Sequence, residues 1–116
     1  MRRWSGTDAS GGVNVRRLTW YAKQVIRSFG DKETERISQR FHSRRFASIE
    51  RIAFRKLRQI ESVDRIEELS EPPGNRLEKL RGNRGGQWSI KINDPWRICF
   101  EWRDGDAWQV EIVDYH

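Results

Sequence analysis

The sequence predicts an α+β domain in which two N-terminal helices pack on one face of a twisted, mainly antiparallel sheet of four to five strands. Three runs, at residues 88–92, 96–103 and 110–113, alternate apolar and polar side chains with a period of two, as strands with one buried face do. Turn-forming residues separate these runs by short connections, so consecutive strands should pair as a meander of hairpins. Before them, residues 32–60 carry apolar side chains at helical spacing.

The first 24 residues should lie outside the domain, which we expect to span residues 25–116. Residues 5–12 are rich in serine and glycine and show no periodicity, which is typical of a flexible or non-native extension. No apolar run follows the first two arginines, so the segment does not resemble a signal peptide. Two alternatives stay open: Trp4, Trp20 and Tyr21 dock on the domain, or the segment is a basic arm that contacts RNA.

The domain should begin with a short strand at residues 25–29, followed by a first helix at residues 32–42. Asp31 is a suitable N-cap, and acidic residues in the first turn favour the helix dipole. Ile37 and Phe41 are four residues apart and should share the buried face.

A second helix should begin after Ser48 as its cap and bury a stripe of Ile49, Ile52, Ala53, Leu57 and Ile60. The opposite side of this helix carries Arg51, Arg55 and Arg58, a basic ridge whose simplest explanation is solubility. Residues 64–69 form a short acidic helical turn that Pro72-Pro73-Gly74 ends. The predicted core contains Ile49, Ile52, Leu57, Ile60, Ile90, Ile98, Phe100 and Ile112, with Trp88 and Trp96 largely buried on the same sheet face.

The charge distribution predicts a polyanionic partner. The net charge is +6 and the isoelectric point is about 10.1, and residues 27–58 hold ten basic and four acidic side chains. The single cysteine, Cys99, excludes an internal disulfide and a cysteine-based zinc site. No apolar run approaches the ~20 residues of a membrane span, so we expect no membrane association and a cytoplasmic location.

Three motifs in the C-terminal half resemble the HigB-type toxins of the RelE superfamily. They are L-x-x-L-x-G-x-R-x-G-x-W-S-I-x-I from Leu77 to Ile92, W-R-I-x-F from Trp96 to Phe100, and D-Y-H at residues 114–116. The resemblance covers residues 25–116, and the P-P-G-N-R-L-E segment at residues 72–78 brings the chain closest to the GraT branch. It implies a RelE-like fold and a ribosome-dependent mRNA endonuclease that inhibits translation. It also implies binding to the ribosome and mRNA, and to a HigA-like antitoxin.

The resemblance also implies the site. Arg97 corresponds to the arginine of W-R-I-x-F and would stabilise the transition state, with a cross-strand ion pair to Glu101 or Glu111 as the alternative. Relatives often have a histidine where this chain has Glu78, which either replaces that histidine as the base or is a plain surface residue. The proton-transfer and RNA-contacting candidates at the chain end are Asp114, Tyr115 and His116. The candidate RNA-binding residues are Arg76, Lys79, Arg81 and Arg84.

The residue types favour metal-free general acid–base cleavage to a 2′,3′-cyclic phosphate. Such cleavage needs a base, an acid and a cation at the phosphate. The only histidines are His42 and His116, and the acidic residues show no ligand spacing, so we expect neither a metal nor a small-molecule cofactor. Two other functions stay open, a non-catalytic RNA- or ribosome-binding module and a protein that only binds a partner through its basic helix.

Overall fold

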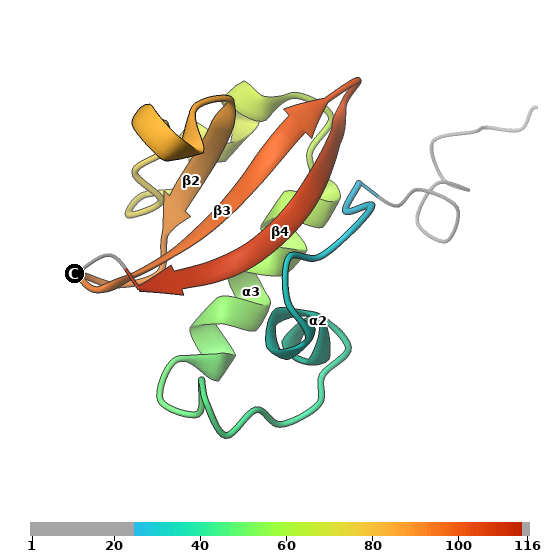
Figure 1. The fold of residues 1–116 in the computed structure, drawn as a ribbon, viewed down its shortest axis with the longest axis vertical. Coiled ribbons are helices and arrows are strands. Elements are labelled where there is room, and N and C mark those ends of the chain that lie inside the picture. The colour runs from blue at the N-terminus through green and yellow to red at the C-terminus, as the bar shows by residue number, and fades with distance from the viewer. Residues whose placement is uncertain (1–24, 115–116) are drawn as a thin grey trace, which may run out of the picture.

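The computed structural model describes residues 25–114, which form the predicted α+β arrangement (Figure 1). The predictions about residues 1–24, Tyr115 and His116 lie outside this range. The elements in chain order are α2 (Lys32–Ser38), α3 (Glu50–Ser62), η2 (Ile66–Ser70), β1 (Glu78–Lys79), η3 (Gly82–Arg84), β2 (Gln87–Lys91), β3 (Trp96–Arg103) and β4 (Asp106–Asp114).

The four strands form one antiparallel sheet in the order β1-β2-β3-β4, which confirms the predicted meander. The α-helices α2 and α3 lie on one side of this sheet, and the other side of β2, β3 and β4 faces the viewer in Figure 1. The connection with Asn93-Asp94-Pro95 joins β2 to β3, and the connection with Asp104-Gly105 joins β3 to β4. Each joins two paired strands, as the turn chemistry predicts.

The segment at residues 25–29 adds to the edge of β4 without forming a full strand. It makes two parallel bridges, Ile26 with Ala107 and Phe29 with Val110. Between these bridges β4 bulges, because two of its residues lie opposite Phe100, and Gln109 has a φ of 55°. The Gln109 amide donates to Ser28 Oγ at 2.9 Å. Residues 25–29 thus supply a hydrogen-bond partner for the irregular edge of β4.

The core between the helices and the sheet contains seven of the eight residues predicted for it, each at most 4% exposed. The exception is Ile52, which is 36% exposed. The inward stripe of α3 is Ala53, Lys56, Leu57 and Ile60, so Ile52 lies beside the stripe rather than on it. Trp88 and Trp96 are half-buried and pack against the core from its margin.

The predicted helix bounds are partly wrong. Asp31 caps α2 as predicted, accepting from the Thr34 amide at 2.7 Å. However, α2 ends at Ser38 rather than at residue 42, and Arg40 has a φ of 67° that no helix can continue. Phe41 therefore turns away from the core and is 55% exposed.

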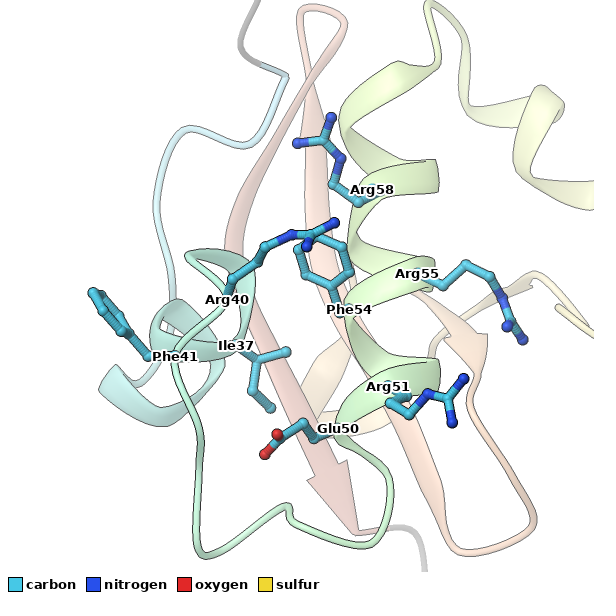
Figure 2. A pocket seen from close by; sticks show the side chains of 8 residues that line it. All are labelled: Ile37, Arg40, Phe41, Glu50, Arg51, Phe54, Arg55 and Arg58. Atoms are coloured by element: carbon cyan, nitrogen blue, oxygen red, sulfur yellow. The ribbon is translucent and has the colours of Figure 1, made fainter.

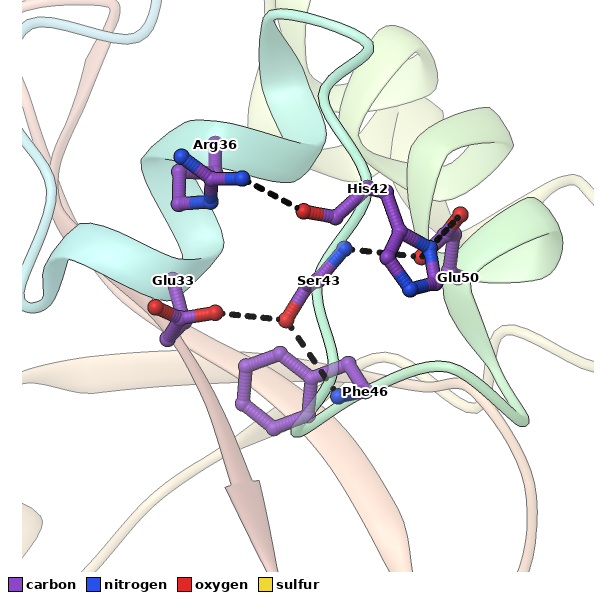
Figure 3. A network of polar contacts seen from close by, with 6 residues as sticks. All are labelled: Glu33, Arg36, His42, Ser43, Phe46 and Glu50. Carbon is purple, nitrogen blue, oxygen red and sulfur yellow. Dashed lines mark hydrogen bonds and ion pairs between the residues drawn. The ribbon is translucent and has the colours of Figure 1, made fainter.

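Ser48 does not cap α3, whose N-cap is Ile49 without a side-chain hydrogen bond. The capping chemistry belongs instead to Ser43, whose Oγ accepts from the Phe46 amide at 3.3 Å in the turn that leads into the helix. Ser43 is buried, and its hydroxyl also donates to Glu33 of α2 at 2.7 Å (Figure 3). Its amide donates to Glu50 of α3 at 3.0 Å. One serine thus ties both helices to the connection between them.

This network predicts a pH-dependent contribution of Glu50 to stability. The Ser43 amide, and to a lesser degree His42, lower the pKa of Glu50 below its ordinary value of 4.5. A lowered carboxyl pKa stabilises the fold at pH values above the unfolded-state pKa, and this contribution is lost as the pH falls through the folded-state pKa. Glu50→Gln should therefore be less stable than wild type at neutral pH, and the gap should close below pH 4.5.

Urea unfolding at several pH values measures this gap. Glu67→Gln is the matched control, since Glu67 is an exposed carboxylate of η2. A Glu50→Gln deficit that is independent of pH would show that the ionised carboxylate is not the source of the stability.

Candidate active site

The sheet face turned away from α2 and α3, which we call the polar face, carries polar side chains from all four strands. Residues directly opposite each other in paired strands share a face. Glu78, Ser89, Cys99 and Glu111 therefore form one row across β1, β2, β3 and β4. Lys91, Arg97 and Val113 form the next row.

Arg97 is held rigidly within this face. Only 8% of the residue is exposed. Its Nε donates to Ser89 Oγ at 2.7 Å, and its Nη2 donates to the Arg76 carbonyl at 2.5 Å and more weakly to the Ser89 carbonyl at 3.4 Å. These bonds fix the plane of the guanidinium, and a fixed cation costs little reorganisation when it stabilises a developing negative charge.

Glu78 is the carboxylate that the structure brings to Arg97. Its Oε1 lies 3.8 Å from Arg97 Nη2, and 56% of its side chain is exposed. The alternative partners considered for Arg97 are engaged elsewhere, since Glu111 pairs with Arg84 and Glu101 with Arg103. The arginine and a solvent-accessible carboxylate thus lie side by side on the polar face.

The carbonyl that binds Arg97 is positioned by the P-P-G-N-R segment. Arg76 has a φ of 47°, which is unusual for a non-glycine residue. The preceding residue, Asn75, is fully buried, accepts from the Lys91 amide at 2.6 Å through its carbonyl and donates to the Leu69 carbonyl at 3.0 Å. Lys56 of α3, whose pKa is lowered by burial, donates to the Asn75 side chain. The buried contacts of Asn75 therefore fix the turn whose carbonyl binds Arg97.

Arg84 crosses the polar face from η3 to β4. It donates to Gln87 at 2.9 Å and to Glu111 at 3.0 Å. Cys99 of β3 lies opposite Ser89 of β2 and Glu111 of β4 in this row, and burial raises the pKa of its thiol. Glu111 in turn lies against Gly30, where an added Cβ would come within 3.0 Å of the Glu111 Cβ.

The other candidate cations are spread around this face. Arg76 and Arg81 are exposed, and Arg81 is the N-cap of η3. Lys79 is opposite Trp88 and therefore on the helix side, with its Nζ 5.7 Å from the centre of the Trp88 ring. Lys79 thus lies apart from the polar face.

Asp114 ends β4 opposite Trp96, so it shares the helix-side face of that tryptophan rather than the face of Arg97. Its side chain is exposed at the end of the sheet. Tyr115 and His116 lie outside the described residues. Of the two carboxylates named as candidate bases, only Glu78 is beside Arg97.

Sequence reasoning missed the residues that fix Arg97. Ser89 alternates with Trp88 and Ile90, and this period alone places it on the face of Arg97. No periodic pattern pointed to Asn75, because its role depends on contacts with Lys56, Leu69 and Lys91. Within residues 25–114, no three histidine, cysteine, aspartate or glutamate side chains are grouped to hold a metal ion. No helix in that range is long and apolar enough to cross a membrane.

The fold is shared with a chain of known structure. Two solved structures of the YoeB-YefM toxin-antitoxin complex from Staphylococcus aureus contain a chain that aligns with this one at TM-scores of 0.51 and 0.52. The sequence identity is 23%, and the alignment covers 78% of this chain and 94% of the other in both cases. The fold class predicted from the sequence is therefore confirmed.

Residues 24–116 match the sequence profile of the RelE-like toxins of type II toxin-antitoxin systems named HigB. The chain belongs to this family. Over 61 residues, or 53% of the chain, it is 44% identical to Toxin HigB-1 of Vibrio cholerae serotype O1 and 38% identical to Endoribonuclease HigB of Proteus vulgaris. The matched stretch spans 64% and 65% of those relatives, slightly under two thirds of each. The nearer relation to the GraT branch stays a prediction.

Proposed function

We propose that this protein is the toxin of a type II toxin-antitoxin pair and cleaves mRNA on the ribosome. The observation that carries the proposal is Arg97, a guanidinium fixed by three hydrogen bonds beside the carboxylate of Glu78 on the sheet face turned away from α2 and α3. A surface that only binds phosphate needs cations, whereas a carboxylate next to the cation supplies a proton acceptor. The relative named Endoribonuclease HigB supports RNA as the substrate.

The proposed reaction is an attack of the RNA 2′-oxygen on the adjacent phosphorus. Glu78 removes the 2′-OH proton, the new bond to phosphorus forms, and the bond from phosphorus to the 5′-oxygen breaks. The leaving oxygen takes a proton from His116, and the products are a 2′,3′-cyclic phosphate and a 5′-hydroxyl end. Arg97, with help from Arg81, neutralises the pentacoordinate phosphorane through charge-assisted hydrogen bonds. No metal ion takes part in these steps.

The remaining candidate residues have secondary roles in this scheme. Asp114, at the end of β4, orients His116, since its own position on the helix side makes it a poorer base for a substrate at Arg97. Tyr115 stacks on a base next to the cut. Arg76 and Arg84 attract the RNA backbone near the polar face, and Lys79 attracts it from the edge strand β1.

Mapping of mRNA ends during translation in a reconstituted system tests the function. We expect cuts within translated codons when the full chain is added, and fewer when His116 is deleted. Cutting should continue when divalent ions are depleted, provided that parallel samples show intact ribosomes. RNA binding without any cut ends would instead support the non-catalytic RNA- or ribosome-binding alternative.

Ser89 is a positioning residue for Arg97, and Ser89→Ala should lower kcat about tenfold with little change in KM. Ser89 is fully buried, and its hydroxyl accepts a hydrogen bond from Arg97 Nε at 2.7 Å. A hydrogen bond to a charged group contributes about 1.5–3 kcal/mol. Without it the guanidinium can rotate from the position that the transition state needs.

The matched control for Ser89→Ala is Ser62→Ala, which removes an exposed serine hydroxyl that bonds to the Gln59 carbonyl at the end of α3. Steady-state cleavage assays separate the two kinetic constants, and thermal unfolding checks that both variants fold. A tenfold rise in KM with unchanged kcat would assign Ser89 to RNA binding rather than to positioning.

The proposed partners are the ribosome, its mRNA and an antitoxin related to HigA. The two structural relatives are toxin-antitoxin complexes, which supports an antitoxin as a partner of this chain. We expect a small gene adjacent to this one to encode that antitoxin. Co-expression with its product should restore growth and yield a complex that co-purifies.

A further inference from the structure

A groove of about 570 Å³ runs between α3 and the residues that follow α2 (Figure 2). Its apolar side chains are Ile37, Phe41 and Phe54, and four arginines also line it. Arg51, Arg55 and Arg58 come from α3 and Arg40 from the connection after α2. We call this feature the basic groove, and none of the residues assigned to RNA cleavage contributes to it.

The apolar part of the basic groove is incompletely covered. Phe41 is 55% exposed because α2 ends before it, so its ring stands beside the groove rather than in the core. Arg40 lies over the Phe54 ring, with its guanidinium carbon 4.6 Å from the ring centre (Figure 2). The Phe41 ring also has a cation over one face, since the guanidinium carbon of Arg36 lies 5.7 Å from its centre. The rest of the exposed Phe41 side chain offers apolar surface to a partner.

The charge of the groove is strongly positive. Among the described residues, the single acid that lines the groove is Glu50, which already accepts hydrogen bonds from the Ser43 amide and His42. With the residues of the described range, Arg51, Arg55 and Arg58 form no ion pair within 4.0 Å, although acids are plentiful elsewhere in the chain. Like charges at helical spacing repel each other, so an anionic occupant would relieve a cost that the free protein carries.

We infer that the basic groove binds an acidic segment of the antitoxin that carries at least one large apolar side chain. This inference rests on the proposed function for the identity of the partner. Carboxylates of the segment would pair with Arg51, Arg55 and Arg58, and the apolar side chain would lie against Phe41. Clusters of arginine commonly recognise acidic motifs in this way.

Two observations favour this occupant over others. Nucleic acid binds through bases stacked on open aromatic faces, but Arg40 lies over one face of Phe54 and Arg36 over one face of Phe41. The remaining apolar surface suits an aliphatic or aromatic side chain. The chain's own first 24 residues hold five basic residues and one acid, so their charge opposes binding in a basic groove. An acidic segment from a different protein matches both the charge and the apolar surface.

The test uses the full chain and three fluorescent probes of equal length. The first is a peptide with leucine and glutamate at helical spacing, the second replaces each glutamate by lysine, and the third is a single-stranded RNA. The groove variant is Arg51→Glu with Arg55→Glu. The control variant, Lys32→Glu with Arg44→Glu, makes the same change in net charge at exposed positions outside the groove.

We expect the acidic peptide to bind wild type, and more weakly as salt rises. The groove variant should raise its Kd at least about tenfold and the control variant less than about twofold. Phe41→Ser should weaken binding of the acidic peptide and leave binding of the other two probes unchanged. Equal peptide binding by the groove and control variants would overturn the inference, and so would RNA binding that the groove variant abolishes while the peptide does not bind.

A second arm co-expresses each variant with the product of the neighbouring gene. The groove variant should lose co-purification and growth rescue while it still cleaves mRNA, and undiminished rescue would overturn the inference. Cleavage by each variant is measured in parallel. A wild-type chain that binds the acidic peptide but cuts no RNA would refute the proposed function and leave the groove as a peptide site, so the two failures are distinguishable.

Discussion

Replacing Arg97 with alanine should lower the rate of mRNA cleavage by about 10²–10³-fold, the usual effect of removing one preorganised donor to a developing oxyanion. The guanidinium is fixed by Ser89 and by the Arg76 carbonyl, so it can meet the phosphorane without moving. Water can partly replace a missing proton donor, whereas it cannot replace the positive charge of Arg97. The loss should therefore exceed that caused by deleting His116.

Single-turnover cleavage of ribosome-bound mRNA measures the effect of Arg97→Ala. Arg103→Ala is the matched control, since Arg103 ends the same strand, pairs with Glu101 and is exposed. Arg97→Lys should recover only part of the rate, because an ammonium keeps the charge but not the planar set of donors. Full cutting by a folded Arg97→Ala protein would remove Arg97 from the mechanism.

Phe100→Ala should destabilise the protein by about 3–5 kcal/mol, the range found when a buried aromatic side chain is removed. Phe100 is fully buried in β3, opposite the bulge in β4, and its ring meets Trp102 with centroids 6.5 Å apart. The helices and the bulged strand enclose it from several sides, so the cavity cannot collapse easily.

Denaturant unfolding measures this loss, and Phe41→Ala is the matched control. Phe41 is 55% exposed, so the same substitution there should change the free energy of unfolding by less than about 0.5 kcal/mol. A loss of less than about 1 kcal/mol at Phe100 would be typical of an arbitrary substitution and would mean that β3 does not bury this face.

The sheet was largely predictable because its signal is local. The period-two alternation in β2 and β3 identified both faces, so Ile90, Ile98 and Phe100 were placed in the core and Arg97 on the open face. Helix bounds were less predictable. The end of α2 depends on the positive φ of Arg40, and the start of α3 depends on Ser43, whose partners Glu33 and Glu50 come from both helices.

The candidate site was predictable in its central arginine but not in its surroundings. The W-R-I-x-F motif pointed to Arg97, and the alternation showed that it lies outside the core. Its near-complete burial depends on the turn at Arg76, which Asn75 fixes through contacts with η2 and β2. Such contacts join residues far apart in sequence and leave no periodic pattern. The choice between Glu78 and Asp114 as the proposed base could not be made from the sequence either, because it depends on the residues that lie opposite them in the paired strands.

In the proposed mechanism, Arg97 and Glu78 promote attack by the RNA's own 2′-oxygen. The direct measurement uses a ribosome-bound mRNA with a single 2′-deoxynucleotide at the mapped cut site, compared with the same mRNA carrying ribose there. The proposed mechanism predicts a 2′,3′-cyclic phosphate and a 5′-hydroxyl on the ribose mRNA, and no cleavage at the deoxynucleotide. Cleavage of the deoxy-substituted mRNA at the same position, with a 3′-hydroxyl and a 5′-phosphate, would contradict it.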